Sequence, residues 1–212
     1  MIFFGGIRTF CLHWSRLSKM TPAPTKIALR SAMRECLRKN APQNHEALQN
    51  RLDALLAKEN AEFCIGYLAF QQEPVLDQFL GKWLAQNRKL LLPRFNSAIR
   101  QYELVEVTDW NSQVAPGHYG IREPKPQLVA IKQVIQTSVW LVPGLAFTAS
   151  GARLGRGAGH YDRLFTKFPQ GKRIGIAWEM QLLPEIPQEP WDLPMDYIVT
   201  ETRTIDCRAP ST

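Results

Sequence analysis

The sequence predicts a three-layer α/β/α domain with a mostly parallel central sheet, and three observations support this. Short apolar runs of strand length alternate with helical patterns along the chain. Two runs, residues 90–92 and 139–142, are apolar at every position, as expected for strands covered on both faces. The 212 residues, 45% of them hydrophobic and 21% charged, suit one α/β domain with a full core.

The first expected element is a helix over residues 26–38, which follows the proline-rich segment TPAPT. Three apolar side chains form a stripe along it: Leu29, Met33 and Leu37. Four basic side chains recur every four positions on another face: Lys26, Arg30, Arg34 and Arg38. Such a face is usually solvated, and the alternative is that one end of it supplies cations to a bound phosphate group.

The remaining elements continue the alternation. A second helix is expected over residues 43–58, and a third is expected to start at Pro74, because proline suits the first helical position. Strands are expected at residues 63–70, 89–93, 102–107, 138–142, 173–177 and 196–200. Ligands of parallel sheets collect at the loops beyond the carboxyl ends of the strands, and one such loop follows Val142.

Residues 21–207 are interpreted as one domain, between an N-terminal extension (residues 1–20) that is disordered or not native and a tail (residues 208–212). Residues 1–19 are basic and free of acids, so an organelle transit peptide, for example a mitochondrial one, is the alternative to an upstream start codon. Without a transit peptide we expect a cytoplasmic protein, because the four cysteines are scattered and form no CxxC pair. No apolar run approaches the ~20 residues that span a bilayer, so no membrane partner is expected.

The net charge of +7 suggests nucleic-acid binding, but its distribution argues against this function. Residues 1–34 carry six basic side chains and no acidic one, which leaves 20 basic and 19 acidic residues in the remainder. Because the body of the chain is nearly neutral, we expect no nucleic-acid partner. A nucleic-acid-binding module driven by the basic N-terminus is kept only as an alternative.

The most informative segment is residues 151–162, GARLGRGAGHYD, which follows the strand at 138–142. Its alternating glycines allow backbone N–H groups to approach an anion without hindrance from a Cβ. Its two arginines are charge-assisted donors for phosphate oxygens, and its final Asp162 is a hard oxygen ligand of the kind that Mg²⁺ prefers. The segment therefore predicts a cradle for nucleotide phosphates. A structural glycine-rich turn is the alternative, since the segment matches neither the Walker loop nor the dinucleotide fingerprint.

An ordered set of motifs runs from residue 26 to about residue 202. These are Lys26-x-x-Leu29-Arg30, Tyr67-Leu68-x-x-x-x-Glu73, Leu92-Pro93-Arg94, Gly120-Ile121-x-Glu123-Pro124, Val142-Pro143-Gly144-Leu145-Ala146-Phe147, residues 151–162 and residues 187–192. In these motifs the chain resembles the 5-formyltetrahydrofolate cyclo-ligase (5,10-methenyltetrahydrofolate synthetase) family. The loop and the Val-Pro-Gly-x-x-Phe motif before it are the most specific part of the resemblance.

The resemblance implies an enzyme that uses ATP and Mg²⁺ to convert 5-formyltetrahydrofolate into 5,10-methenyltetrahydrofolate, with release of ADP and phosphate. The family is thought to phosphorylate the formyl oxygen, after which N10 of the folate closes the ring. Such phosphoryl transfer depends on positioning and charge neutralisation, and no protein nucleophile is expected. The implied substrate is the small molecule with or without a polyglutamyl tail, and the protein is expected to be a monomer or a weak homodimer.

The resemblance also implies the site residues, position by position. ATP contacts fall on Lys26, Arg30, Arg153, Leu154, Gly155, Arg156, Gly157, Ala158, Gly159, His160 and Tyr161. Substrate contacts fall on Leu68, Glu73, Tyr119, Arg156, Gly157, Ala158, Gly159, His160 and Tyr161. Metal contacts fall on Asp162 and Asp192, while Arg34 and Arg38 keep the interpretation as a solvated face.

The chain departs from the family pattern at three positions. Thr148, Ala158 and His160 stand where the family usually has Asp, often has Gly, and usually has Tyr or Phe. These departures leave open a catalytically weakened member that binds folate as a regulatory protein. ATP-dependent turnover distinguishes that alternative from the enzyme.

Overall fold

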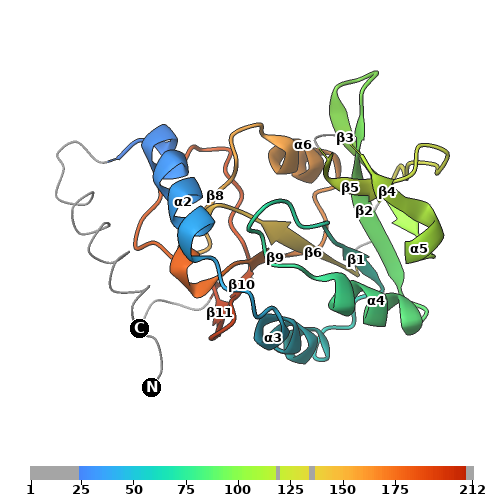
Figure 1. The fold of residues 1–212 in the computed structure, drawn as a ribbon, viewed down its shortest axis with the longest axis horizontal. Helices are drawn as coiled ribbons and strands as arrows, with labels where there is room; N and C mark the ends of the chain where they lie inside the picture. Colours follow the sequence, from blue (N-terminus) through green and yellow to red (C-terminus); the bar gives the residue numbers. More distant parts are fainter. Residues whose placement is uncertain (1–23, 118–119, 134–136, 209–212) are drawn as a thin grey trace.

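A computed structural model describes residues 24–117, 120–133 and 137–208, so the predicted extension of residues 1–20 lies outside the described residues. A seven-stranded sheet forms the centre of the fold, in the order β11-β10-β9-β6-β1-β2-β3 (Figure 1). Its strands are β1 (Phe63–Ile65), β2 (Lys89–Asn96), β3 (Gln101–Val107), β6 (Ser138–Pro143), β9 (Lys172–Ile176), β10 (Tyr197–Val199) and β11 (Thr204–Asp206). The five inner strands are parallel to one another, and the edge strands β3 and β11 are antiparallel to their neighbours. The mostly parallel sheet is confirmed.

Helices cover both faces of this sheet, as the apolar strands predict. Three of them pack on one face: α2 (Lys26–Asn40), α3 (Glu46–Leu56) and α4 (Asp77–Ala85). The fourth, α6 (His160–Lys167), packs on the other face, and Figure 1 shows it on the opposite side of the sheet from α3 and α4. Successive residues of β6 alternate between the faces, because Val139 and Leu141 join the cluster of α2–α4 while Trp140 and Val142 join that of α6. The three-layer arrangement follows from this alternation.

Two predicted boundaries are wrong, and both lie in the segment between β1 and α4. The strand expected at 63–70 ends at Ile65, and the helix expected from Pro74 begins at Asp77. Hydrogen bonds compete with the regular structure in between: the Tyr67 hydroxyl donates to the Pro74 carbonyl (2.7 Å), and the amide of Val75 donates to Nδ1 of His45 (3.0 Å). These contacts hold residues 67–75 as a turn. The ends of the other predicted elements either agree with the structure or are shifted by one to three residues.

Several short elements were not predicted, because pieces of two to four residues carry no periodic signal. They are α5 (Trp110–Gln113), β4 (Val114–Pro116), β5 (Arg122–Pro124), β7 (Ala146–Phe147), β8 (Arg153–Leu154), the 3₁₀ turn η2 (Glu179–Gln181) and the edge strand β11 of the central sheet. β4 pairs with β5 and β7 pairs with β8, both as antiparallel hairpins. The second hairpin turns the chain back after β6 and delivers the glycine-rich segment to the end of the sheet. No helix in the described ranges combines the length and the apolarity needed to cross a membrane.

Gly151, at the turn of the β7–β8 hairpin, ties the glycine-rich segment to the stretch of chain before β10. Its φ is +90°, a left-handed conformation that side chains disfavour. The amide of Met195 donates to the Gly151 carbonyl (2.9 Å). A Cβ at Gly151 would lie only 2.5 Å from the Met195 carbonyl oxygen. The close approach of the two segments therefore requires glycine at this position.

We expect Gly151→Ala to destabilise the protein by ~3 kcal/mol, because it combines strain at positive φ with a collision against backbone that cannot rotate away. Gly81→Ala is the matched control: Gly81 lies inside α4, with nothing within 4 Å of an added Cβ. It should stabilise the protein by ~0.5–1 kcal/mol through helix propensity. Urea unfolding of both variants measures the two changes in the free energy of unfolding. Equal midpoints would contradict the conclusion that Gly151 is required for the close approach of the two segments.

Candidate functional site

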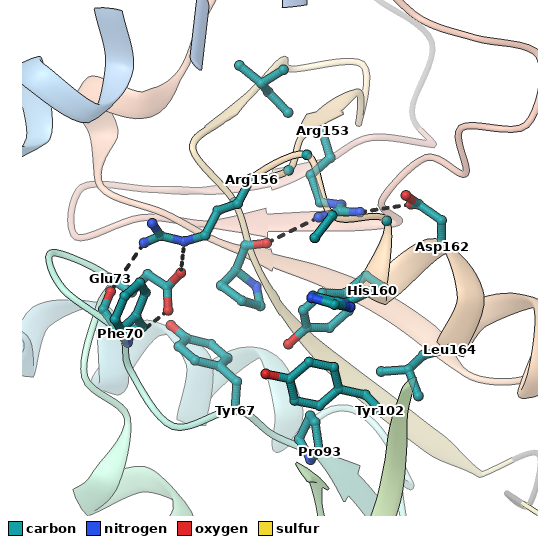
Figure 2. A pocket seen from close by; sticks show the side chains of 18 of the residues that line it. Tyr67, Phe70, Glu73, Pro93, Tyr102, Arg153, Arg156, His160, Asp162 and Leu164 are labelled. Atoms are coloured by element: carbon teal, nitrogen blue, oxygen red, sulfur yellow. Dashed lines mark hydrogen bonds and ion pairs between the residues drawn. The ribbon is translucent and has the colours of Figure 1, made fainter. Parts of the chain in front are cut away.

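A cavity of about 400 Å³ opens where the parallel strands end. Tyr67 and Leu68 line it from the chain that leaves β1, and Pro143 and Gly144 line it from the end of β6. Pro93 of β2 also lines the cavity (Figure 2). The cavity therefore occupies the carboxyl-terminal edge of the sheet, where ligands of parallel sheets are expected.

This cavity brings together nearly all the residues that the sequence singled out. Lys26, Arg30, Leu68, Glu73, Asp192 and every residue of 153–162 line it. The exception is Tyr119, which lies outside the described residues. The segments concerned are separated by as many as 166 positions in the chain, so their meeting is a property of the fold. Their individual roles stay predictions.

The glycine-rich segment adopts an open backbone without strain. Gly157 (φ +104°) and Gly159 (φ +65°) take left-handed conformations, and Gly159 is the residue immediately before α6. Ala158 does not have a positive φ, so its methyl group is compatible with the loop. α2 braces the segment from outside: Arg30 Nε donates to the carbonyl of Gly155 and Arg34 donates to that of Arg156, both at 3.0 Å. Arg34, expected on a solvated face, is exposed and also contacts this loop.

Arg153 provides the buried cation at the floor of the cavity, with a side chain only 10% exposed. Its guanidinium contacts Asp162 Oδ1 (3.0 Å) and the Pro143 carbonyl (3.5 Å), and lies 5.4 Å from the centre of the Tyr161 ring (Figure 2). Burial lowers the pKa of Arg153, and the charge of Asp162 opposes that shift. Arginine nevertheless stays protonated in proteins, so a fixed positive charge faces the cavity.

A second ion pair lines the cavity at the start of α2. Lys26 Nζ lies 2.6 Å from Asp192 Oδ2, and the amide of Glu189 donates to the same oxygen (2.8 Å). Partial burial alone would raise the pKa of Asp192, but these two hydrogen bonds and the charge of Lys26 more than offset it, and the pKa lies below its usual value. Asp192 is therefore ionised at neutral pH.

Both predicted metal ligands, Asp162 and Asp192, are thus paired with predicted phosphate-binding cations. No cluster of three or more His, Cys, Asp or Glu side chains suited to a metal exists among the described residues. Magnesium, however, is commonly held by one or two carboxylates together with substrate phosphates and water. The two aspartates therefore fit a magnesium ion that arrives with a nucleotide, and they do not form an all-protein metal site.

The opposite side of the cavity centres on Glu73, which forms a network with Arg156. Arg156 Nε donates to Glu73 Oε1 (3.0 Å) and the amide of Phe70 donates to Oε2 (3.0 Å), as Figure 2 shows. Arg156 also donates to Gln71 Oε1 (2.9 Å) and lies 4.9 Å from the centre of the Phe70 ring. Burial raises the pKa of Glu73 above its usual value, although the charge of Arg156 works against that shift.

Aromatic rings line the cavity between these two polar ends. The ring of His160 meets that of Tyr102 edge to face, with centroids 4.7 Å apart. Tyr67 is buried and Tyr161 is partly buried, and desolvation raises the pKa of both hydroxyls far above the usual range, so both are neutral. Tyr102 was missed in the sequence because it lies in an edge strand 58 positions before His160. No local pattern predicts which strand residue a loop will contact.

Glu123 is a second residue whose position the sequence does not reveal. It is only 6% exposed and lines the cavity, and its Oε2 accepts from the amide of Phe95 (3.3 Å). Its Oε1 is buried and has no hydrogen-bond partner in the described part of the chain. The Gly-Ile-x-Glu-Pro motif marked this glutamate, but without a role. An unpartnered buried carboxylate oxygen costs free energy, which is typical of residues kept for function.

We expect Glu123→Gln to raise the free energy of unfolding by ~1 kcal/mol, because it removes a buried negative charge and keeps the acceptor for Phe95. Glu103→Gln is the matched control: Glu103 is also buried, but its two oxygens accept from Arg94 (Oε1) and Asn96 (Oε2). That variant should lose about 2 kcal/mol, because Arg94 is left without its counter-charge. Thermal unfolding of the two ligand-free variants and of the wild type measures these changes. If both substitutions destabilise the protein, the buried carboxylate of Glu123 has favourable interactions after all, and the expectation is wrong.

Comparison with known proteins identifies relatives of this chain. A sequence model of the 5-formyltetrahydrofolate cyclo-ligase family matches residues 23–201. The 5-formyltetrahydrofolate cyclo-ligase of Mycolicibacterium smegmatis is 34% identical over 166 residues, which cover 76% of this chain and 83% of that protein. The cyclo-ligase of Haemophilus influenzae is 27% identical, with 73% and 86% covered. In structure, the 5,10-methenyltetrahydrofolate synthetase of Aquifex aeolicus superposes with a TM-score of 0.73 at 26% identity, over 88% of this chain and 95% of that one.

Proposed function

The chain belongs to the 5-formyltetrahydrofolate cyclo-ligase family, and we propose that it converts 5-formyltetrahydrofolate into 5,10-methenyltetrahydrofolate with consumption of ATP in the presence of Mg²⁺. One observation carries the proposal. A single cavity holds a glycine-rich loop with two cation–carboxylate pairs at one end and a buried glutamate with aromatic rings at the other. Two substrates of different chemistry can therefore meet in it.

The loop end suits the triphosphate of ATP. Gly155, Gly157 and Gly159 leave the backbone open to close approach by phosphate oxygens, and Arg153 and Lys26 supply positive charge on either side. The start of α6 follows Gly159, and the first turn of a helix also favours negative charge. The loop therefore holds the phosphates, with backbone donors and fixed cations sharing the charge.

The glutamate end suits the folate. A reduced pterin has N–H donors along its edge, and Glu73 accepts hydrogen bonds from them. The pterin also has a flat face, against which Tyr102 and His160 pack. Arg156 joins the two ends, because it belongs to the loop and contacts Glu73. We therefore expect the formyl group of the folate to face the loop.

The chemistry follows from this placement. The formyl oxygen takes the terminal phosphoryl group of ATP, which releases ADP and turns a poor leaving group into a good one. N10 of the folate then attacks the activated formyl carbon, phosphate departs, and N10 loses its proton as the methenyl bridge forms. Arg153, Lys26 and the loop amides neutralise the charge on the transferred group, and no protein nucleophile is needed. Asp162 and Asp192 would hold a Mg²⁺ ion, which would supply positive charge against the developing negative charge of the phosphates.

The three departures from the family pattern are accommodated in the structure, which favours the enzyme over the regulatory alternative. The Thr148 hydroxyl accepts from the amide of Ala152 (3.0 Å) and so closes the turn of the β7–β8 hairpin. Ala158 avoids positive φ, and His160 packs against Tyr102. The cytoplasmic location, the absence of nucleic-acid and membrane partners, and the monomeric or weakly dimeric state stay predictions.

We expect Asp162→Asn and Asp192→Asn each to reduce kcat/KM at saturating Mg²⁺ by roughly 10²-fold or more, or ~3 kcal/mol of transition-state stabilisation. Asp53→Asn serves as the control, because Asp53 forms a surface pair with Lys82 and is not among the residues that line the cavity. The assay follows the methenyl product from 5-formyltetrahydrofolate and ATP. Absence of product with the unmodified chain would refute the enzyme and leave the regulatory alternative.

We expect the affinity for 5-formyltetrahydrofolate to fall on acidification at a higher pH than an ordinary glutamate would cause. The pKa of Glu73 is raised by burial. Above that pKa the side chain is a carboxylate that accepts the pterin N–H groups, and this contribution to binding is lost as the pH falls through the pKa. Titrations between about pH 5 and pH 8 measure this for the wild type and for Glu73→Gln, whose side chain does not titrate. An identical pH profile in the two proteins would eliminate Glu73 as the titrating group.

A further inference from the structure

Trp191 combines exposure with a place in the wall of the cavity. Its side chain is 69% exposed, although burial of an indole is strongly favourable. Among the large apolar side chains that are exposed in the described ranges, it alone lines this cavity. Two others, Ile27 and Leu193, directly follow the two members of the Lys26–Asp192 ion pair in the chain. Exposed apolar residues are therefore the chain neighbours of the ion pair at the end of the cavity that is assigned to phosphate and metal, and Trp191 is the one that lines the cavity.

A short hydrogen-bonded turn fixes the backbone beside Trp191. The amide of Asp192 donates to the Glu189 carbonyl (3.0 Å), and the amide of Glu189 donates back to Asp192 Oδ2 (2.8 Å). Lys26 fixes the same carboxylate from α2. Pro190 and Trp191 lie between the ends of this turn, and Trp191 directly precedes Asp192, so its backbone is tied to the ion pair.

We propose that Trp191 is the stacking platform for the purine base of the nucleotide, an inference that rests on the ATP-dependent function proposed above. With the phosphates at the glycine loop and Lys26, the base must lie outward along the wall of the cavity, and Trp191 presents the exposed aromatic face there. Base–aromatic stacking is worth about 1–3 kcal/mol per base. A protein partner seated on Trp191 would instead cover the cavity to which this side chain belongs.

The proposal also determines the selectivity for the base. Stacking alone tolerates different bases, because every base has a π-face, and a larger ring system stacks over more area. The site should therefore accept ATP and GTP similarly and bind the pyrimidine nucleotides CTP and UTP more weakly. A site that reads the base edge through hydrogen bonds would separate ATP from GTP.

The test compares ATP with inorganic tripolyphosphate, both with Mg²⁺, on the full chain. The wild type should bind ATP at least about fivefold more tightly than tripolyphosphate, the lower limit of the stacking range. Trp191→Ala should remove most of this difference by weakening ATP alone, and Trp191→Phe should restore part of it. The control is Ile99→Ala, since Ile99 is an exposed apolar residue outside the cavity. The KM for ATP should rise in Trp191→Ala while that for 5-formyltetrahydrofolate stays constant.

The outcomes separate this inference from the function on which it rests. If the wild type turns over and Trp191→Ala binds ATP as tightly as the wild type, the stacking role is refuted and the proposed function stands. If Trp191→Ala weakens ATP and tripolyphosphate equally, the residue acts through the phosphate site and the stacking role is again refuted. A loss of self-association with unchanged ATP affinity would make Trp191 a contact between copies. Absence of ATP binding and of turnover in the wild type would refute both proposals.

Discussion

The buried guanidinium of Arg153 is the interaction on which the rest of the site depends. A charge in the interior must be compensated by nearby groups, or it unfolds the structure around it. Arg153 comes from β8, and its compensation comes from Asp162 in α6 and from the carbonyl of Pro143 at the end of β6. One charge therefore determines how three successive segments are placed around the cavity, and the glycine-rich loop between β8 and α6 has to close over it.

The same electrostatic requirement shapes the rest of the cavity. Lys26 pairs with Asp192, as Arg156 does with Glu73, so these cations of the ligand-free cavity, like Arg153, each have a carboxylate beside them, while Arg30 donates to the carbonyl of Gly155. A nearly neutral cavity is stable without ligands, whereas a row of unpaired cations would repel one another. An anion that enters must bring its own cation or displace a carboxylate, which agrees with a nucleotide bound as its magnesium complex. Folding and binding thus make compatible demands on these side chains.

The end of the cavity around Glu73, where we propose that folate binds, depends on hydrogen bonds that replace regular structure. The turn that carries Glu73 is held by the Tyr67 hydroxyl on Pro74 and by the Trp178 indole N–H on the carbonyl of Gln72 (2.9 Å). Trp178 follows β9, which lies two strands away from β1 in the sheet. This turn, which interrupted the predicted strand and delayed the predicted helix, is therefore the structure that presents the acid to the cavity.

The sequence by itself determined the layers, most of the elements and most of the candidate site. Periodicity along the chain reports which faces are buried, and a glycine-rich loop with flanking charges is recognisable because its chemistry is concentrated in twelve consecutive residues. Asp192 was named only through family resemblance, since it does not stand out from its local sequence, and the same resemblance selected Lys26 and Arg30 from the basic face of their helix.

Only the tertiary structure decided which charges pair, which carboxylate oxygen lacks a partner and which aromatic side chain remains exposed. Two contacts join segments that are far apart in the chain: that of Arg34 with the loop (3.0 Å) and the edge-to-face contact of Tyr102 with His160. The burial of Glu123 and the exposure of Trp191 likewise depend on the folded chain around them. The physical reason is that hydrogen bonds, burial and Coulomb interactions depend on distance in space. Local sequence encodes that distance only within a helix turn or along a strand.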